Sequence, residues 1–239
     1  WQPWEYQYLL ALLFFLFSKD RKQFLSLVTF FLAATYIFSG IHKFGGSFLY
    51  TFWDRVILHK LLGFSYNEFM NPVMHYSGLM LPVIEVAVGI GILFIRSRNF
   101  FASLAISMHL AIVLIFGPSG LNHNIIIFPW NLAMMALVGI LFYKNSEPNC
   151  SLSFFRSKLN TAAFLLVGVL PVFCLFGKWD DYLSFNLYSG NTKTLVICVE
   201  DIKEHAELKP YKTQKGSSMY CDDNCLINTT AWALDELKV

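Results

Sequence analysis

Long apolar runs separated by short polar connections dominate residues 1–177. A helix needs about 20 mostly apolar residues to cross the hydrocarbon core of a bilayer. We therefore predict six membrane segments, at 5–18, 24–44, 72–95, 99–117, 123–143 and 157–177. The first segment is short, so we expect it to be tilted or half-inserted, with Trp1, Trp4 and Tyr6 at the interface.

Segment 45–70 has a different pattern, because apolar residues recur at helical spacing among charged ones such as Asp54, Arg55 and Lys60. Such a pattern predicts an amphipathic helix. Two interpretations stay open: the helix lies in the outer membrane interface, or it packs over the mouth of the bundle.

The tail changes character again after residue 177. Residues rich in β-formers, Tyr182–Tyr188 and Thr194–Val199, flank a Ser-Gly-Asn-Thr turn and predict a β-hairpin. A helix is expected at Thr230–Leu237, with Asn228 or Thr229 as its N-cap. The predicted fold is an all-α polytopic membrane helical bundle (1–177), including one interfacial amphipathic helix, followed by a small C-terminal α/β extramembrane domain (178–239).

Composition agrees with a membrane protein. The chain is 56% hydrophobic and only 14% charged, whereas soluble domains carry about 25% charged residues. Residues 1–177 hold 11 Lys and Arg against 6 Asp and Glu, a net charge of +5, and residues 178–239 hold 7 against 10, a net charge of −3. The basic residues stand at helix ends and form no patch, which argues against nucleic-acid binding.

The basic residues also predict orientation, because Lys and Arg accumulate in cytoplasmic loops. Three alternate connections carry them, at 19–22, 96–98 and 144–158. We therefore expect a multi-pass membrane protein whose segment 45–70 and C-terminal domain lie on the outer side of the membrane. The sequence lacks an initiator Met and a secretory signal pattern, so we expect it to be part of a longer gene product at both ends.

Glu85 is the only carboxylate of the segment 71–95. A carboxylate at membrane depth is costly unless it is paired or protonated, so it is a candidate functional residue. It could accept a proton, pair with a histidine or bind a polar head group. The alternative is a structural polar clamp between helices.

Two further residues could act with Glu85. Lys43 follows His42, itself a candidate ligand contact, where the second segment ends. A lysine held against apolar surface can become a base; a snorkelling lysine is the alternative. His109 lies in the middle of the fourth segment and is the expected partner of Glu85. A histidine that only bridges two helices is the alternative.

Polar residues also gather at the start of the fifth segment. Asn122 and His123 precede Trp130 and could line a head-group pocket, although Asn122 could equally cap the helix. The histidines have no metal-binding spacing, so no metal site is expected.

Five cysteines are present, and Cys198, Cys221 and Cys225 lie in the tail expected outside the membrane. A disulfide could join Cys221 to Cys225, or one of these to Cys198. A redox-active dithiol is the alternative, although the spacing is not Cys-x-x-Cys.

These residues in order resemble a known family. The motif Tyr36…Gly40-Ile-His42-Lys43-Phe44, then Glu85 with Arg96-Ser-Arg98, then His109 and Phe128-Pro129-Trp130, resembles the HTTM or vitamin K-dependent γ-carboxylase transmembrane domain. The pattern Leu81-Pro82-x-x-Glu85-x-x-x-Gly89 is similar to DoxX/MauE-type membrane proteins, which are associated with quinone-linked or thiol-linked redox processes. The first resemblance implies that Lys43 is a catalytic base. The two resemblances together imply the bacterial inner membrane, with segment 45–70 and the C-terminal domain in the periplasm.

The function expected from sequence is therefore binding of a quinone or lipid-like molecule. Lys43, Glu85 and His109 would be its polar contacts, with a redox or proton-transfer role in addition. The sequence leaves open whether the protein is an enzyme. The alternative is a non-catalytic accessory subunit of a larger membrane complex, whose partners would be other membrane subunits as well as lipids.

Overall fold

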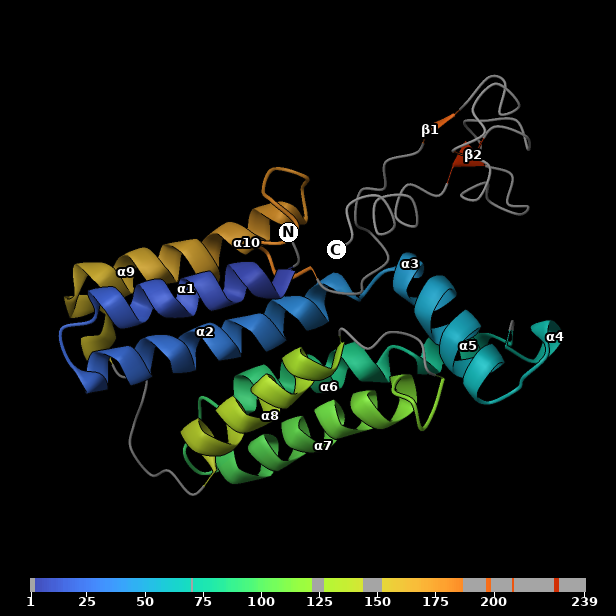
Figure 1. Cartoon of the computed structure of the whole chain (residues 1–239), viewed down its shortest axis with the longest axis horizontal. Coiled ribbons are helices and arrows are strands. Elements are labelled where there is room, and N and C mark those ends of the chain that lie inside the picture. The colour runs from blue at the N-terminus through green and yellow to red at the C-terminus, as the bar shows by residue number, and fades with distance from the viewer. Residues whose placement is uncertain are drawn as a thin grey trace. The chain divides into compact units, whose positions relative to one another are not determined.

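The computed structural model describes residues 3–69, 71–121, 127–143, 152–186, 197–198, 208 and 226–227. The chain forms two compact units, Trp1–Thr192 and Lys193–Val239. The described part of the first unit is mainly helical (Figure 1). The described part of the second unit contains two short strands, β1 (Ile197–Cys198) and β2 (Leu226–Ile227), which pair antiparallel.

The first two helices form an antiparallel pair joined by a tight turn. α1 spans Pro3–Phe17 and α2 spans Arg21–His42. Asp20 caps α2 by accepting a hydrogen bond from the backbone N–H of Gln23 at 2.8 Å. The Gln23 side chain in turn donates to Ser157 at 2.6 Å and to Asn160 at 2.8 Å. This polar contact fixes the start of α2 against α9 (Lys158–Phe164).

Segment 45–70 folds as one helical stretch followed by a separate short helix. α3 (Gly46–Phe48) continues directly into the π-helical segment η1 (Leu49–Leu61), and α4 (Tyr66–Phe69) follows after a break. Gly63, with φ of 76°, stands just after the end of η1. Its left-handed backbone favours glycine, so a regular helix does not continue through it.

The predicted helix 72–95 is interrupted and ends early. It forms α5 (Pro72–Ser77) and α6 (Met80–Gly91), separated by a turn at 78–79. Pro82 has no N–H for the helical bond to the Gly78 carbonyl, and Leu81 N–H donates to that carbonyl instead, at 3.2 Å. A Cβ on Gly78 would lie 2.4 Å from the Trp53 ring, so the absence of a side chain at this position lets η1 approach closely.

Two helices complete the central group, α7 (Arg98–Phe116) and α8 (Ile127–Phe142). η2 (Leu152–Arg156), α9, η3 (Leu165–Val169) and α10 (Leu170–Cys174) follow. The predicted segment 157–177 is therefore not one regular α-helix. Its π-helical turn η3 ends two residues before Pro171, which cannot donate a backbone hydrogen bond.

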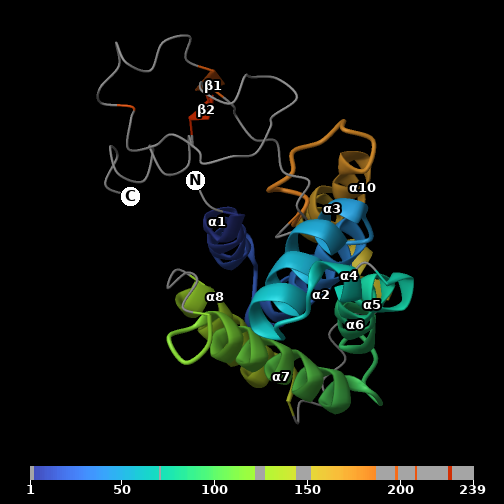
Figure 2. The ribbon, with the colours of Figure 1, turned by 90° about the vertical axis from the view of Figure 1, so that its right-hand side faces the viewer.

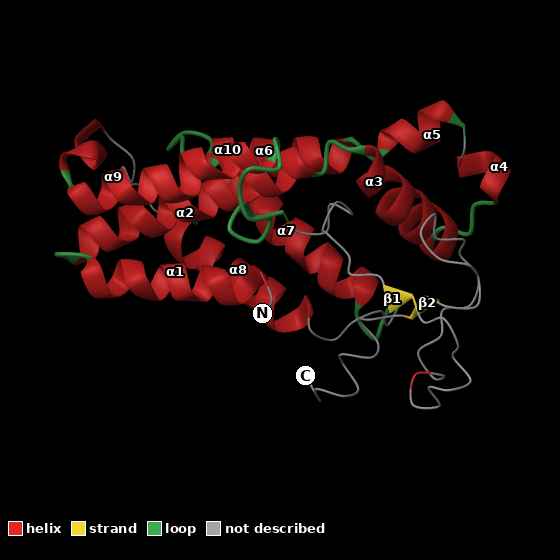
Figure 3. Ribbon diagram, turned by 90° about the horizontal axis from the view of Figure 1, so that it is seen from above, coloured by secondary structure: helices red, strands yellow, loops and turns green. Residues whose placement is uncertain are grey.

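The helices of this unit are stacked in order. α2 packs extensively on α6, α6 contacts α7, and α7 packs on α8. α7 and α8 lie on the side of α2 away from α10, as the two orthogonal views agree (Figures 1 and 2). Figure 3 shows the same unit from above with its helices in red. The largest hydrophobic core lies among α2, α6, α7 and α8, around Leu32, Val88, Ala105 and Val138.

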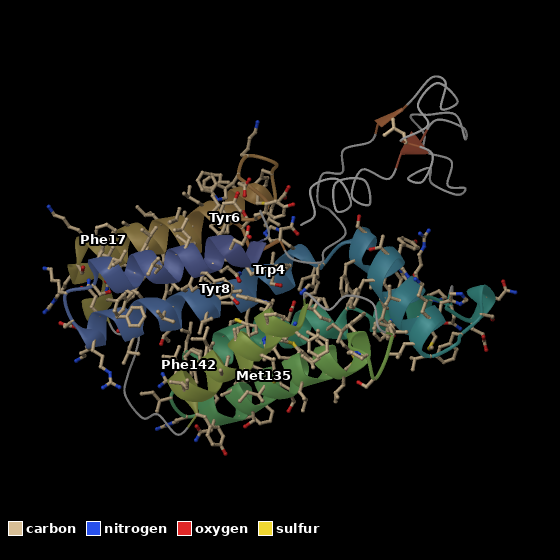
Figure 4. All side chains as sticks on the ribbon, viewed as in Figure 1. Trp4, Tyr6, Tyr8, Phe17, Met135 and Phe142 are labelled. Atoms are coloured by element: carbon tan, nitrogen blue, oxygen red, sulfur yellow. The ribbon has the colours of Figure 1, made fainter. Side chains whose placement is uncertain are left out.

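Aromatic side chains on α1 connect it to both sides. Tyr6 stacks on Tyr182, with ring centroids 6.2 Å apart, and Tyr8 meets the edge of Trp130 on α8 at 5.7 Å. The labelled sticks show Tyr6 and Tyr8 leaving α1 in different directions (Figure 4). α1 therefore links the α8 side of the unit to the segment after α10.

Among the described residues, three helical stretches are long and apolar enough to cross a membrane: Arg21–His42, Pro72–Gly91 and Arg98–Phe116. The other three predicted segments are helical but shorter, at Trp4–Phe17, Ile127–Phe142 and Lys158–Cys174. The protein is therefore a helical chain with three candidate membrane spans.

The first strand of the predicted β-hairpin, 182–188, does not form over its described part, and residues 187–196 and 199 of the hairpin lie outside the described residues. Residues 181–185 form turns, because the Asp180 carboxylate accepts from the backbone N–H groups of Tyr182 and Leu183, both at 2.9 Å. Phe185 is buried against Phe31 on α2 and keeps this segment with the helical unit. β1 pairs instead with β2, much further along the chain. The predicted helix at 230–237 lies outside the described residues.

Candidate functional site

A pocket of about 560 Å³ opens among α2, η1, α6, α7 and α8. Most of its wall is apolar, and it includes Phe52, Trp53, Ile84, Met108 and Ile112. Its polar lining consists of Thr35, Tyr36, Ser39, Lys43, Glu85, Ser107, His109 and Asn131. A concave apolar site with a few convergent polar groups is the usual form of a small-molecule binding site.

An ion pair between α2 and α6 lies on this pocket. The Lys43 Nζ is 2.6 Å from both carboxylate oxygens of Glu85 and 3.0 Å from the Ser39 hydroxyl oxygen. The two charged side chains are only 10% and 13% exposed. An ammonium group has three N–H donors, so the three contacts use all of them, and the geometry is that of a charged lysine.

Two glycines allow the close approach that forms this pair. A Cβ on Gly40 of α2 would lie 2.8 Å from the carbonyl oxygen of Pro82 on α6. A Cβ on Gly89 of α6 would lie 2.8 Å from the carbonyl oxygen of Ala33 on α2. Small residues let helix backbones approach in this way. Lys43 comes one turn after Gly40, so the same approach brings its side chain to Glu85.

A second polar chain crosses from α2 through α7 to α8. Tyr36 Oη lies 2.7 Å from His109 Nε2, and His109 Nδ1 lies 2.7 Å from Asn131 Oδ1. The Asn131 amide donates to the carbonyl of Ile127 at 2.7 Å. A carbonyl can only accept, which fixes the amide nitrogen toward Ile127 and its oxygen toward the histidine.

The tautomer of His109 follows from this arrangement. The Asn131 oxygen can only accept, so His109 Nδ1 carries a proton. His109 is 6% exposed, and a buried cation without a counter-ion is costly, so the imidazole is neutral and Nε2 accepts. The Tyr36 hydroxyl then donates to Nε2, and its oxygen lone pairs stay available to a ligand.

η1 forms the remaining wall and is held by α5. The buried Asp54 carboxylate contacts His75 Nδ1 at 2.7 Å, and the Trp53 indole donates to the Met74 carbonyl at 2.8 Å. Phe116 on α7 and Ile127 on α8 pack on the other face of η1. Of the two interpretations of segment 45–70, the structure places η1 over the pocket.

The structure brings together most of the residues predicted for the site. Lys43, Glu85, His109 and Trp130 all line the pocket. His42 is buried elsewhere, near the Asp181 carboxylate and the Ser184 backbone, and its Nε2 has no hydrogen-bond partner among the described residues. Its position differs because residues 42 and 43 point to different sides of α2.

The other predicted site residues cannot be placed. Asn122, His123, Cys221 and Cys225 lie outside the described residues, as does the side chain of Cys198, whose backbone belongs to β1. Within the described ranges, no group of three or more His, Cys, Asp or Glu could hold a metal ion.

The predicted pairing of Glu85 with His109 is wrong. Glu85 binds Lys43, and His109 binds Tyr36 and Asn131. A carboxylate gains more from an ammonium that it can contact through both oxygens than from a neutral imidazole. The two charged groups therefore neutralise each other, and the uncharged groups form their own chain.

Sequence reasoning missed Tyr36, Ser39 and Asn131 as site residues. A signal for the first two was present, because positions 36, 39 and 43 have the spacing of one helix face. Two polar side chains on the same apolar helix face as a lysine indicate a shared polar surface. Asn131 directly follows Trp130 near the start of α8, and only the helix packing shows that it reaches His109.

No protein-family model, curated protein or solved structure matches this chain. The candidate site is therefore defined by its own geometry.

Proposed function

We propose that the chain is a multi-pass membrane protein that binds a quinone or another lipid-like amphiphile in the pocket among α2, η1, α6, α7 and α8. The observation that carries the proposal is the Lys43–Glu85 ion pair on the wall of a mostly apolar pocket. Burying an ion pair costs more than burying apolar residues of the same size. Its position on an open pocket favours a role in binding over one in packing.

The apolar wall and the polar side chains of the pocket have distinct roles in this proposal. The apolar wall holds the ring or acyl chain of the ligand, and Glu85 and Tyr36 contact its head. Lys43 neutralises the Glu85 charge. Because all three Lys43 N–H groups are engaged, the base role implied by the γ-carboxylase resemblance would first require a proton to leave the ammonium. We therefore propose binding as the function, and proton transfer stays a prediction.

We further propose that the six segments lie in a bacterial inner membrane, with the C-terminal residues on the periplasmic side. The distribution of Lys and Arg in the sequence supports this orientation. The α1–α2 connection, the α6–α7 connection and the start of α9 also lie at one end of the unit (Figure 1), as loops on a common cytoplasmic side would.

The proposal is tested by identifying what copurifies with the protein. Ser107 and Ser103 are both exposed on α7, but only Ser107 lines the pocket. Ser107→Phe places a ring in the pocket, and Ser103→Phe is the matched control. Mass spectrometry of solvent extracts should show one amphiphile enriched over bulk lipid in the wild type and in S103F, and lost in S107F. Equal lipid profiles in all three proteins would refute pocket binding and leave a packing role as an accessory subunit.

A further inference from the structure

We infer that the pocket selects an uncharged head that donates a hydrogen bond, such as a hydroxyl, and excludes anionic heads. The inference rests on the proposed function, because it describes the head of the amphiphile that the pocket binds. The preference for such a head follows from the hydrogen-bond donors and acceptors near the Lys43–Glu85 ion pair that the protein itself leaves free.

The positive charge of Lys43 is not available to a ligand. Its three N–H groups donate to the two oxygens of Glu85 and to the hydroxyl of Ser39. A carboxylate or phosphate head would therefore find no free charged donor there. It would instead lie beside the Glu85 carboxylate, which is an unfavourable contact between like charges.

The free polar atoms around the ion pair are mainly acceptors. Each Glu85 oxygen accepts from Lys43 alone among the described residues and keeps a free lone pair. The Tyr36 proton is directed at His109, so the phenolic oxygen also accepts. A ligand hydroxyl can donate to either of these atoms, and a charged acceptor makes the stronger bond.

The donors that remain on the pocket are uncharged. The Ser39 hydroxyl accepts from Lys43 and can still donate, and the Ser107 hydroxyl also lines the pocket. A hydroxyl head can donate to Glu85 and accept from one of these groups together. An ether or ketone head can only accept, and an anion would depend on uncharged donors alone.

The shared chemistry is a neutral hydroxyl on an apolar body, and two sources carry it: a hydroxylated lipid or the reduced form of a quinone. Competition binding to the detergent-solubilised protein separates head preference from source. The probes are dodecanol, its methyl ether and dodecanoate, which share one alkyl chain, together with tetramethylhydroquinone and its quinone.

Dodecanol should bind about tenfold more tightly than its methyl ether, because one charge-assisted hydrogen bond is lost in the ether. Dodecanoate should bind more weakly still. If the hydroquinone binds more tightly than dodecanol, the natural ligand is inferred to be a reduced quinone. If dodecanol binds more tightly, the natural ligand is inferred to be a hydroxylated lipid. If the methyl ether or dodecanoate binds as tightly as dodecanol, the inferred preference for a hydroxyl head is wrong, but the proposed binding of an amphiphile in the pocket still stands. Failure of every probe to bind, with no copurifying amphiphile, would refute the proposed function itself.

The Glu85→Gln variant gives a second test. It removes the negative charge and frees Lys43 to pair with an anion, so dodecanoate should gain at least about tenfold in affinity. Glu68→Gln is the control, because Glu68 is exposed on α4 and does not line the pocket. Unchanged dodecanoate affinity in a folded E85Q protein would contradict the inference. If the E85Q protein does not fold, the affinities of the wild-type protein for the five probes still test the inferred head preference.

Discussion

Removing the ammonium of the Lys43–Glu85 pair should destabilise the protein strongly. Lys43→Met keeps the side-chain length but leaves the Glu85 carboxylate, 13% exposed, without its counter-ion. Breaking one partner of a buried ion pair costs about 3–5 kcal/mol, because the remaining charge is desolvated and unpaired.

The double variant should recover most of this loss. Replacing Glu85 by Leu in the K43M background removes the unpaired charge and fills the space with apolar atoms. Apolar replacement of a whole buried ion pair is often neutral or stabilising. We expect the double variant to lie within about 1 kcal/mol of the wild type, which makes the coupling between the two positions about 3–5 kcal/mol.

Reversible unfolding in mixed micelles, followed by helical circular dichroism, measures these free energies. Lys60→Met is the matched control, since Lys60 is an exposed lysine on η1, and such a change should stay within about 0.5 kcal/mol. A K43M protein as stable as K60M would show that Glu85 does not depend on Lys43, and the ion pair would have to be rejected.

Three further predictions follow from the packing. Gly40→Val should destabilise the protein by about 1–3 kcal/mol, because a Cβ at position 40 has no room beside the Pro82 carbonyl. Gly139→Ala is the control and should not destabilise it, because the nearest atom lies 4.0 Å from the new Cβ. Equal melting temperatures of the two variants would contradict close packing of α2 on α6. Asp54→Ala should lower the free energy of unfolding by about 1–3 kcal/mol, because it leaves the buried His75 without its partner. It should also weaken ligand binding, because η1 loses a contact that holds it to α5. Unchanged ligand affinity would show that η1 does not cover the ligand. Hydrogen bonds from the Ser65 hydroxyl and backbone N–H lower the pKa of Glu68, so this contact stabilises α4 above the pKa of the unfolded chain and is lost as pH falls through the lowered value. An NMR titration should show the Glu68 pKa rising in Ser65→Ala, and an unmoved midpoint would refute the capping contact.

The helices were predictable because apolar composition and length dominate where a chain can sit in a membrane. The interruptions at Gly78 and before Pro171 were not predicted, although each involves a residue with a clear backbone effect. Proline signals a break but does not say whether the chain turns, kinks or continues. The strand predicted from Tyr182 does not form at its start, because the Asp180 side chain accepts hydrogen bonds from the backbone N–H groups of Tyr182 and Leu183.

The convergence of Lys43, Glu85 and His109 on one pocket was expected from the cost of polar groups at membrane depth. Which of these residues pair with each other was not predictable from the sequence, because any two of the three can form a hydrogen bond. The choice depends on how α2 crosses α6, and Gly40 and Gly89 set that close approach. The aromatic wall from η1 was also hidden, since the amphipathic pattern of 45–70 fits an interfacial helix as well as a cover over the pocket.

Photo-crosslinking in the membrane tests the central claim most directly. A long-chain alcohol carrying a diazirine near its head would be activated in membranes that contain the protein, and the labelled peptides mapped. Binding in the pocket predicts labels around Trp53 of η1 and Met108 of α7, competed away by excess dodecanol. Labels found only at outward-facing residues such as Val73 and Ile140, each 77% exposed, and unaffected by the competitor, would contradict the account.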